Sequence, residues 1–306
     1  MQIKGMFSLI GYALLIGSVG FFARVIEGLD LMTVVFFRAL LAAGFIAIYA
    51  AGTGSLKDLR PNNIPVMGIS ALFQGLMMLT FIGAALNTTI ANAVFITNTA
   101  PIFAVFFSQI FLKEKISTAT LGGLLLTTIA VCLIVDVRNF SLSSEHLLGD
   151  MLALASSVCY AAATVSAKKL SDDNSGACIA FWQMGLTALA LTPFITMPAP
   201  SVLISAAIPL FGIGVVASGI AFLLFQSGVK NLPAQQVHII TSLGIVIPAG
   251  FAWLLLGEPM STLTIAACAL ILIGVIWVQT TAVHPVSEDD FHEAPTRRLR
   301  PVSISR

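Results

Sequence analysis

The sequence has few charged residues. Lys, Arg, Asp and Glu make up 9% of its 306 residues, against about 25% in an ordinary soluble domain. Hydrophobic residues make up 58%, and the mean hydropathy is +0.98. A soluble fold of this length could not cover so much apolar surface. The composition therefore excludes an ordinary soluble domain and predicts an integral membrane protein with the lipid bilayer as a partner.

Several functional motifs are also absent from the sequence. It contains no HExxH motif, no glycine-flanked nucleophilic serine and no CxxC pair. The cysteines, which we expect to be small buried hydrophobic residues, all lie in apolar runs: Cys132, Cys159, Cys178 and Cys268. Long basic runs for nucleic acid are missing outside the C-terminal segment. We therefore predict no catalytic residue, metal, cofactor or nucleic-acid partner, and we do not favour a polytopic membrane enzyme or a channel.

Apolar runs dominate what is present. A transmembrane helix needs about 20 apolar residues. The chain has ten such runs, at 7–25, 33–51, 64–84, 90–111, 119–136, 148–168, 178–197, 204–227, 235–255 and 262–281. Short polar segments connect them. The pattern predicts an all-α membrane protein with ten transmembrane helices.

The basic residues predict how these helices are oriented, because cytoplasmic loops of membrane proteins are enriched in Lys and Arg. If the N-terminus is cytoplasmic, one group of basic residues falls inside together with the four arginines of the C-terminal segment: Lys4, Lys57, Arg60, Lys113, Lys115, Lys168, Lys169 and Lys230. Arg138 then lies in an outer loop and Arg24 near an outer helix end. We therefore expect both termini to be cytoplasmic.

The chain also contains an internal repeat. A shift of 144 residues aligns "ITNTAPIFAVFFSQIFLKEKISTAT" (96–120) with "ITSLGIVIPAGFAWLLLGEPMSTLT" (240–264) without a gap. The same shift aligns Glu114 with Glu258 and Gly5 with Gly149. We predict a first five-helix repeat at 1–140 and a second at 141–281. The polar, Pro-rich segment 282–306 is predicted to be a disordered cytoplasmic tail.

An odd number of helices per repeat has a consequence for topology. With five spans in each half, the second half enters the membrane from the opposite side, which gives an inverted repeat. Secondary transporters use this architecture, because exchanging the conformations of two inverted halves moves the opening of a central site from one face to the other. The repeat therefore predicts alternating access to a site near the membrane midplane.

Three stretches carry a resemblance to a known family: "FFRALLAAG" (36–44), "TAPIFAVFFSQIFLKEKIS" (99–117) and "IVIPAGFAWLLLGEPMS" (245–261). With the ten spans, they resemble the EamA family of the drug/metabolite transporter superfamily over essentially all of 1–281. The resemblance implies a ten-helix transporter. The first four helices of each half would surround a central cavity, with the fifth outside. It also implies export of small metabolites, notably amino acids and their relatives.

Two prolines and two glutamates are candidates for helix breaks and gates. Pro101 and Pro248 lie inside the fourth and ninth runs, where proline removes a backbone hydrogen bond and bends the helix. Simple packing kinks are the alternative. Glu114 and Glu258 follow at the ends of these runs. For Glu258 we expect hydrogen bonds to the backbone amides that open the next helix, at Thr262, with a gate contact as the alternative.

Polar and aromatic residues at membrane depth are candidates for substrate binding. The predicted set is Arg38, Gln74, Phe95, Thr97, Asn98, Tyr160, Trp182, Gln183, His238, Thr241 and Ser242. Arg38 could bind a substrate carboxylate, or extend to the outer surface, or pair with Glu27 or Asp30. For the uncharged polar residues the alternative is hydrogen bonding between helices. For the aromatic residues it is a place in the core or at the membrane interface.

The apolar runs contain no Asp or Glu near their middle, where ion-driven carriers often place one. Coupling would then use His238 or an acid at a membrane end, and our hypothesis is that ion coupling is weak or absent. We predict an inner-membrane or plasma-membrane exporter of an amino acid or a related zwitterion, with import of a vitamin or nucleoside derivative as the alternative. Gly122, Gly123, Ala266 and Ala267 give small helix faces, which suit a monomer or a homodimer.

Overall fold

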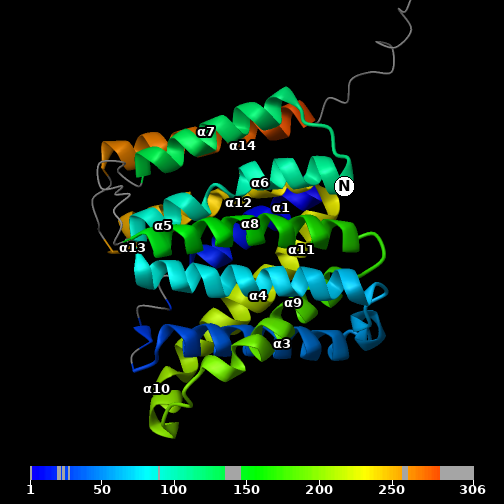
Figure 1. Ribbon diagram of the computed structural model, residues 1–306, viewed down its shortest axis with the longest axis vertical. Coiled ribbons are helices and arrows are strands. Elements are labelled where there is room, and N and C mark those ends of the chain that lie inside the picture. The colour runs from blue at the N-terminus through cyan, green and yellow to red at the C-terminus, as the bar shows by residue number, and fades with distance from the viewer. Residues whose placement is uncertain are drawn as a thin grey trace, which may run out of the picture.

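The computed structural model describes residues 2–18, 22, 25, 26, 28–88, 90–134, 146–256 and 261–282. All regular elements within these residues are helices (Figure 1). Arg24, Glu27, Arg138 and Glu258 lie outside the described residues, as does the predicted tail from residue 283 onward.

The first half of the chain forms α1 (Gln2–Gly17), α3 (Leu31–Gly52), η1 (Leu56–Leu59), α4 (Ile64–Asn87), α5 (Ile90–Thr97), α6 (Ala100–Phe107), η2 (Ser108–Leu112) and α7 (Thr118–Ile134). The second half forms α8 (Leu147–Leu170), α9 (Gly176–Leu191), η4 (Thr192–Phe194), α10 (Pro200–Phe211), η5 (Gly212–Ile220), α11 (Ala221–Asn231), α12 (Ala234–Thr241), α13 (Leu243–Leu256) and α14 (Thr262–Ala282). The segments η2 and η5 are π-helical, and η1 and η4 are 3₁₀ turns.

The helices coincide with the ten apolar runs. Six helical segments are long and apolar enough to cross a membrane: Leu31–Gly52, Ile64–Ala84, Phe95–Leu112, Leu147–Leu170, Gly176–Phe194 and Pro200–Asn231. Four shorter apolar segments are Ile3–Gly17, Thr118–Leu133, Ala234–Ile247 and Thr262–Val278. The prediction of an all-helical membrane protein is confirmed, whereas the crossing of the membrane by all ten segments remains a prediction.

Polar side chains begin several of these helices. Asp30 accepts a hydrogen bond from the backbone amide of Thr33 at 2.9 Å, which starts α3. Ser117 does the same for the amide of Thr120 at 3.0 Å, near the start of α7. Such caps satisfy amides that have no partner within the helix. Asp30 is therefore engaged at its own helix end, and Arg38 instead bonds to Ser218.

Two glycines allow two helix pairs to approach closely. Gly5 of α1 packs on the end of α11, where an added Cβ would lie 2.8 Å from Cβ of Asn231. Gly149 of α8 packs on the end of α4, where an added Cβ would lie 2.5 Å from the carbonyl carbon of Asn87. The two contacts are related by the shift of 144 residues, which carries 5 to 149 and 87 to 231.

Helices α7 and α14 lie side by side along one edge of the molecule (Figure 1). Their contact also uses small residues. An added Cβ on Gly122 would lie 2.6 Å from the ring of Trp277, and one on Gly123 would lie 2.4 Å from Val278. The small face predicted on α7 is thus occupied within the chain. On α14, Ala267 is buried, whereas Ala266 is exposed.

The basic residues gather at one end of the helices. The start of α1, the α3–α4 loop with η1 and the α8–α9 loop lie at this end (Figure 1). Lys168 donates to the carbonyl of Lys230 there, at 3.0 Å. Among the basic residues that the structure describes, Arg38 alone lies within a helix away from this end. We call it the basic end below.

Candidate functional site

The fourth and ninth helical segments are each interrupted near their middle. In the first half, α5 ends at Thr97 and α6 begins at Ala100, so the break lies at residues 98 and 99. In the second half, α12 ends at Thr241 and α13 begins at Leu243, so the break lies at residue 242. The shift of 144 residues carries 98 to 242, so the two breaks occupy equivalent positions.

Side-chain hydroxyl groups bond to backbone carbonyls at both breaks, and a proline lies next to the first break. The hydroxyl of Thr99 donates to the carbonyl of Ile96 at 2.7 Å, and Pro101, in the first turn of α6, has no amide hydrogen to donate. At the second break the hydroxyls of Thr241 and Ser242 both donate to the carbonyl of His238 at 3.1 Å. Such bonds compete with backbone donors and bend helices.

The position of the second break differs from the predicted one. Helix α13 continues from Leu243 through position 248 to Leu256, so Pro248 lies within the helix and the break is six residues earlier. The local hydroxyl bonds, rather than the proline, mark the break. The side chain of Pro248 lies outside the described residues.

A cavity of about 100 Å³ lies between the two breaks. Its lining comes from both halves of the chain: Tyr12, Ile16, Thr97, Asn98, Ala100, Pro101, Tyr160, His238, Thr241 and Ser242. Seven of these ten residues belong to the predicted site or helix-break residues. Tyr12, Ile16 and Ala100 line the cavity but were not predicted from the sequence. Two signals were available: a tyrosine inside the apolar first run, and the position of Ile16, which is 144 residues before Tyr160.

Two polar atoms in this wall have no partner among the described residues. Nε2 of His238 and Oγ1 of Thr97 are both buried, and neither makes a hydrogen bond. The ring of Tyr160 meets the imidazole of His238 edge-on, with ring centres 4.6 Å apart. Buried polar groups normally have hydrogen-bond partners, so these two atoms are available to a guest molecule in the cavity.

The chemistry of the cavity wall is polar but largely uncharged. Hydroxyl, amide and imidazole groups line it, and its lining residues include no Lys, Arg, Asp or Glu. Its volume corresponds to only about three water molecules, far below the roughly 300–1,000 Å³ of a drug-sized site. A metabolite therefore fits only after the helices around the breaks move apart.

Arg38 lies next to the cavity without lining it. Its Nε donates to the hydroxyl of Ser218 at 2.6 Å, and that hydroxyl donates to the carbonyl of Ile213 at 2.7 Å. Both residues of this second bond belong to the π-helical segment η5, and π-helical turns are often found at functional sites. The guanidinium also lies near enough to Tyr12 of the cavity wall for an electrostatic interaction.

Gln74 and Gln183 of the predicted set belong to a buried region outside the cavity lining. Gln183 donates to the hydroxyl of Ser70 at 3.0 Å and accepts from Gln226 at 2.8 Å. The amide nitrogen of Gln74 is buried without a hydrogen bond. The hydrogen bonds of Gln183 connect α4, α9 and α11, as expected for contacts between membrane helices.

The remaining aromatic candidates, Trp182 and Phe95, also lie outside the cavity lining. The indole of Trp182 donates to the carbonyl of Leu59 at 2.9 Å and thereby holds η1 on α9. Phe95 is a half-buried residue of α5. Thus Trp182 helps to hold the two halves together at the basic end of the molecule.

Glu114 forms a second contact between the halves at the basic end. Its Oε1 accepts a hydrogen bond from the backbone amide of Ala234, the first residue of α12, at 3.1 Å. The side chain of Gln235 donates to the carbonyl of Lys115 at 2.9 Å. Burial raises the pKa of Glu114, against the opposing effects of the Ala234 amide and of Lys168. We call this set of contacts the Glu114 latch.

The bonding of Glu114 differs from the bonding predicted for Glu258, which occupies the equivalent position in the second repeat. For Glu258 the predicted partners are the backbone amides of the next helix in the chain. For Glu114 the amide comes from α12 in the other half, because Ser117 already caps the next helix, α7. Ser261 takes the same role for α14, accepting from the amide of Thr264 at 3.1 Å. Glu258 itself lies outside the described residues.

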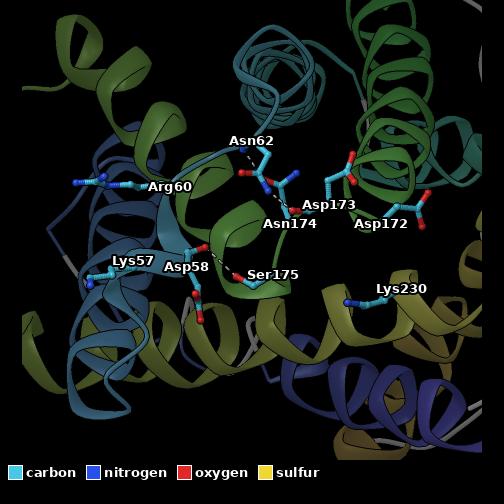
Figure 2. Close-up of a pocket in the computed structure, with 9 residues that line it drawn as sticks. All are labelled: Lys57, Asp58, Arg60, Asn62, Asp172, Asp173, Asn174, Ser175 and Lys230. Carbon is cyan, nitrogen blue, oxygen red and sulfur yellow. Dashed lines mark hydrogen bonds between the residues drawn. The ribbon is translucent and has the colours of Figure 1, made fainter.

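A larger hollow of about 530 Å³ opens at the basic end (Figure 2). Its floor is the docking of the α3–α4 loop on the α8–α9 loop, where Asn62 donates to Asn174 at 2.9 Å and Ser175 donates to the carbonyl of Asp58 at 3.1 Å. Figure 2 shows the charged ends of Lys57 and Arg60 pointing away from the α8–α9 loop. This hollow is lined by loop residues at one end of the molecule, whereas the smaller cavity lies at both helix breaks, so the smaller cavity is the better candidate site.

Comparison with known proteins agrees with this arrangement. The model of the EamA-like transporter family matches residues 3–136 and again residues 147–280. An uncharacterized transporter of Archaeoglobus fulgidus is 26% identical over 264 residues, which cover 86% of this chain and 92% of that protein. The pseudopaline exporter CntI of Pseudomonas aeruginosa PAO1 is 28% identical over 252 residues, covering 81% of this chain and 86% of that protein.

A solved crystal structure is also similar to the fold. It superimposes with a TM-score of 0.78 at 18% sequence identity, covering 92% of this chain and 99% of that one. This likeness concerns the fold alone.

Proposed function

Because the chain belongs to the EamA-like transporter family, we propose that it carries a small organic metabolite across the membrane through the cavity between the two helix breaks. One observation carries this proposal. The cavity lies where both halves interrupt their helices at equivalent positions, and its wall holds two buried polar atoms without partners, on His238 and Thr97. No described cluster of His, Cys, Asp and Glu provides a metal centre for an enzyme instead.

For the topology, we propose ten membrane-spanning segments arranged as two inverted five-helix repeats with both termini in the cytoplasm. The helix contacts support it. Helix α1 lies against α11 as α8 lies against α4, and Gly5 and Gly149 mediate these two contacts. The gathering of the described basic residues at one end supports a cytoplasmic basic end. The protein would then reside in an inner or plasma membrane.

Alternating access would open the cavity to one face at a time. At the basic end the halves are joined by the Glu114 latch and by the loop contacts of Asn62 and Ser175. Breaking these contacts would let α12 move away from the end of η2 and open the cavity to the cytoplasm. Residues 240 and 96, on either side of the cavity, would then separate.

The proposed substrate is a small neutral or zwitterionic metabolite, such as an amino acid or a relative, and the proposed direction is export. The uncharged polar wall suits such a compound. Arg38 lies close enough to attract a carboxylate once the cavity widens. The relative from Pseudomonas aeruginosa is named an exporter, which supports this direction, whereas import of a vitamin or nucleoside derivative is the alternative.

An efflux assay tests the proposal. Cells that express the protein are loaded with a panel of labelled amino acids and analogues, and the label released to the medium is measured against empty-vector cells. We expect faster release of at least one compound, lost in Ser242→Ala and kept in Ser205→Ala, which alters an exposed serine of α10. Uptake without release would support import. No difference from empty-vector cells for any compound in either direction would contradict the proposal.

A further inference from the structure

Asp150 is a buried carboxylate at the interface between the two halves. It lies in the first turn of α8 and is only 4% exposed. Its Oδ1 accepts hydrogen bonds from the hydroxyl of Thr88 at 2.7 Å and from the amide of Asn92 at 3.0 Å. Its Oδ2 is also buried and has no hydrogen-bond partner among the described residues.

Among the described helices that pack against α8, those near Asp150 offer no positive charge: α4, α5, α6 and η2 contain no titratable side chain. Helices α11 and α12 also contact α8 and carry Lys230 and His238, which lie near its other end and beside Tyr160. The nearest described titratable side chain along the sequence is that of His146, which directly precedes α8 and whose carbonyl accepts the amide hydrogen of Asp150 at 3.0 Å. The positive end of the α8 dipole favours a carboxylate here. The dipole does not give Oδ2 a hydrogen-bond partner, however, and a buried charge without a partner is costly.

A proton fits this oxygen better than a metal ion does. Metal cations such as Ca²⁺ or Mg²⁺ need about six oxygen ligands. Here the Thr88 hydroxyl and the Asn92 amide group already donate to Oδ1, and the described residues contain no metal-binding group of three His, Cys, Asp or Glu side chains. A single proton on Oδ2 removes the buried charge without further ligands.

The position of Asp150 connects it to the cavity. Two turns further along α8, the hydroxyl of Ser157 lies 2.9 Å from that of Thr99 at the first helix break. Tyr160, on the next turn, lines the cavity. The first turn of α8 is also pressed against α4 through Gly149, so movement of α8 against α4 would change the environment of Asp150 and of the break together.

The acid is present in one half only. The shift of 144 residues carries Asp150 to Met6 of α1, which has no charge to titrate. Two otherwise similar helix contacts, α8 with α4 and α1 with α11, therefore differ in a single ionisable group. A proton would then stabilise closure at one end of the molecule and not at the other.

We propose that Asp150 is a proton-binding site that couples transport to the proton gradient, an inference that rests on the proposed transport function. When the α4–α8 contact is open, the carboxylate takes up one proton from the adjoining aqueous phase and becomes a neutral carboxylic acid. The neutral form allows α8 to close on α4 with Oδ2 buried. Coupling to the gradient requires that the same proton is then released to the opposite aqueous phase, after the basic end has opened. This proposal replaces our hypothesis of weak or absent ion coupling.

Two measurements on the purified full-length protein test it. The first is infrared difference spectroscopy during a pH titration, which detects the carbonyl stretch of a buried protonated carboxylic acid and needs no substrate. We expect a band that is lost in Asp150→Asn and kept in Asp172→Asn, which changes an exposed aspartate of the α8–α9 loop.

The second measurement is transport into proteoliposomes under an imposed pH gradient. We expect the gradient to accelerate the wild type and Asp172→Asn, and to have no effect on Asp150→Asn, whose exchange of substrate without a gradient persists. An unchanged infrared band in Asp150→Asn, or gradient stimulation retained in that variant, would overturn the proposal. So would stimulation by a sodium gradient alone. An Asp150-dependent band in a protein that transports nothing would instead contradict the transport function and leave the proton site standing.

Discussion

At the scale of single residues, the cavity depends on a few polar atoms that the surrounding helices bury and leave unpaired. His238 is the clearest case, since it is 2% exposed and its Nε2 has no described partner. A binding site for an uncharged guest needs such atoms, because each neutral hydrogen bond contributes about 0.5–1.5 kcal/mol. Specificity then depends on where these atoms sit and on which hydrogen bonds they can make.

His238→Ala should therefore weaken substrate binding. Because the variant loses one neutral hydrogen bond to the substrate, we expect the half-saturating substrate concentration to rise about 2- to 10-fold. His238→Gln keeps a hydrogen-bonding group and should lose less. Initial transport rates over a range of concentrations measure this, normalised to protein in the membrane. If His238→Ala and the wild type had the same half-saturating substrate concentration, the substrate would not bind at His238.

Glu114 predicts a dependence of stability on pH. Burial raises its pKa above the ordinary value of 4.5, so the folded protein binds this proton more tightly than the unfolded chain. Stability then falls as the pH rises from about that value through the raised pKa. Thermal unfolding of Glu114→Gln across this range should show a smaller fall than that of the wild type. Parallel curves for the two proteins would show that the pKa of Glu114 is the same in the folded and unfolded states, and would contradict the prediction.

At the scale of helices, the close contact of α7 with α14 is open to a direct test. Gly123→Val should lower the unfolding temperature, because the new Cβ would lie 2.4 Å from Val278 and overpacking typically costs about 1–3 kcal/mol. Gly68→Val is the matched control, since nothing lies within 4 Å of its added Cβ on α4. Equal unfolding temperatures for the two variants would contradict the contact.

The helices themselves could be predicted from the sequence, because long apolar runs with polar connections have few other solutions in lipid. The first helix break was also foreseeable from Pro101. The second lies at residue 242 rather than at Pro248, next to a pair of hydroxyl bonds from Thr241 and Ser242 to one carbonyl, and a role for Pro248 as a kink within α13 stays a prediction. Such bonds depend on side-chain conformations that a residue pattern does not specify.

At the scale of the whole molecule, the repeat predicted which residues meet. Thr97, Asn98, Thr241 and Ser242 occupy equivalent positions and line one cavity. Contacts between different helices could not be foreseen in the same way. The bond of Arg38 to Ser218 and that of Glu114 to the start of α12 join residues 180 and 120 positions apart. The burial of Asp150 likewise depends on how α8 packs against α4.

The proposed orientation of the molecule leads to a labelling prediction. Lys57→Cys, in a chain whose four native cysteines are replaced by alanine, should react with a membrane-impermeant thiol reagent only from the cytoplasmic side. Lys57 belongs to η1 at the basic end, which positive residues place in the cytoplasm. Reaction from the outer face of intact cells would reverse the assigned topology.

The central claim is that the cavity between the two breaks is the path of the transported metabolite. The most direct test is Thr97→Cys in the same cysteine-free chain, treated with impermeant thiol reagent from each side of the membrane in turn. We expect reaction from both sides, because alternating access exposes the cavity to each face, and slower reaction when the transported metabolite is present. A cysteine that reacts from one side only, or at a rate that the metabolite does not change, would contradict it.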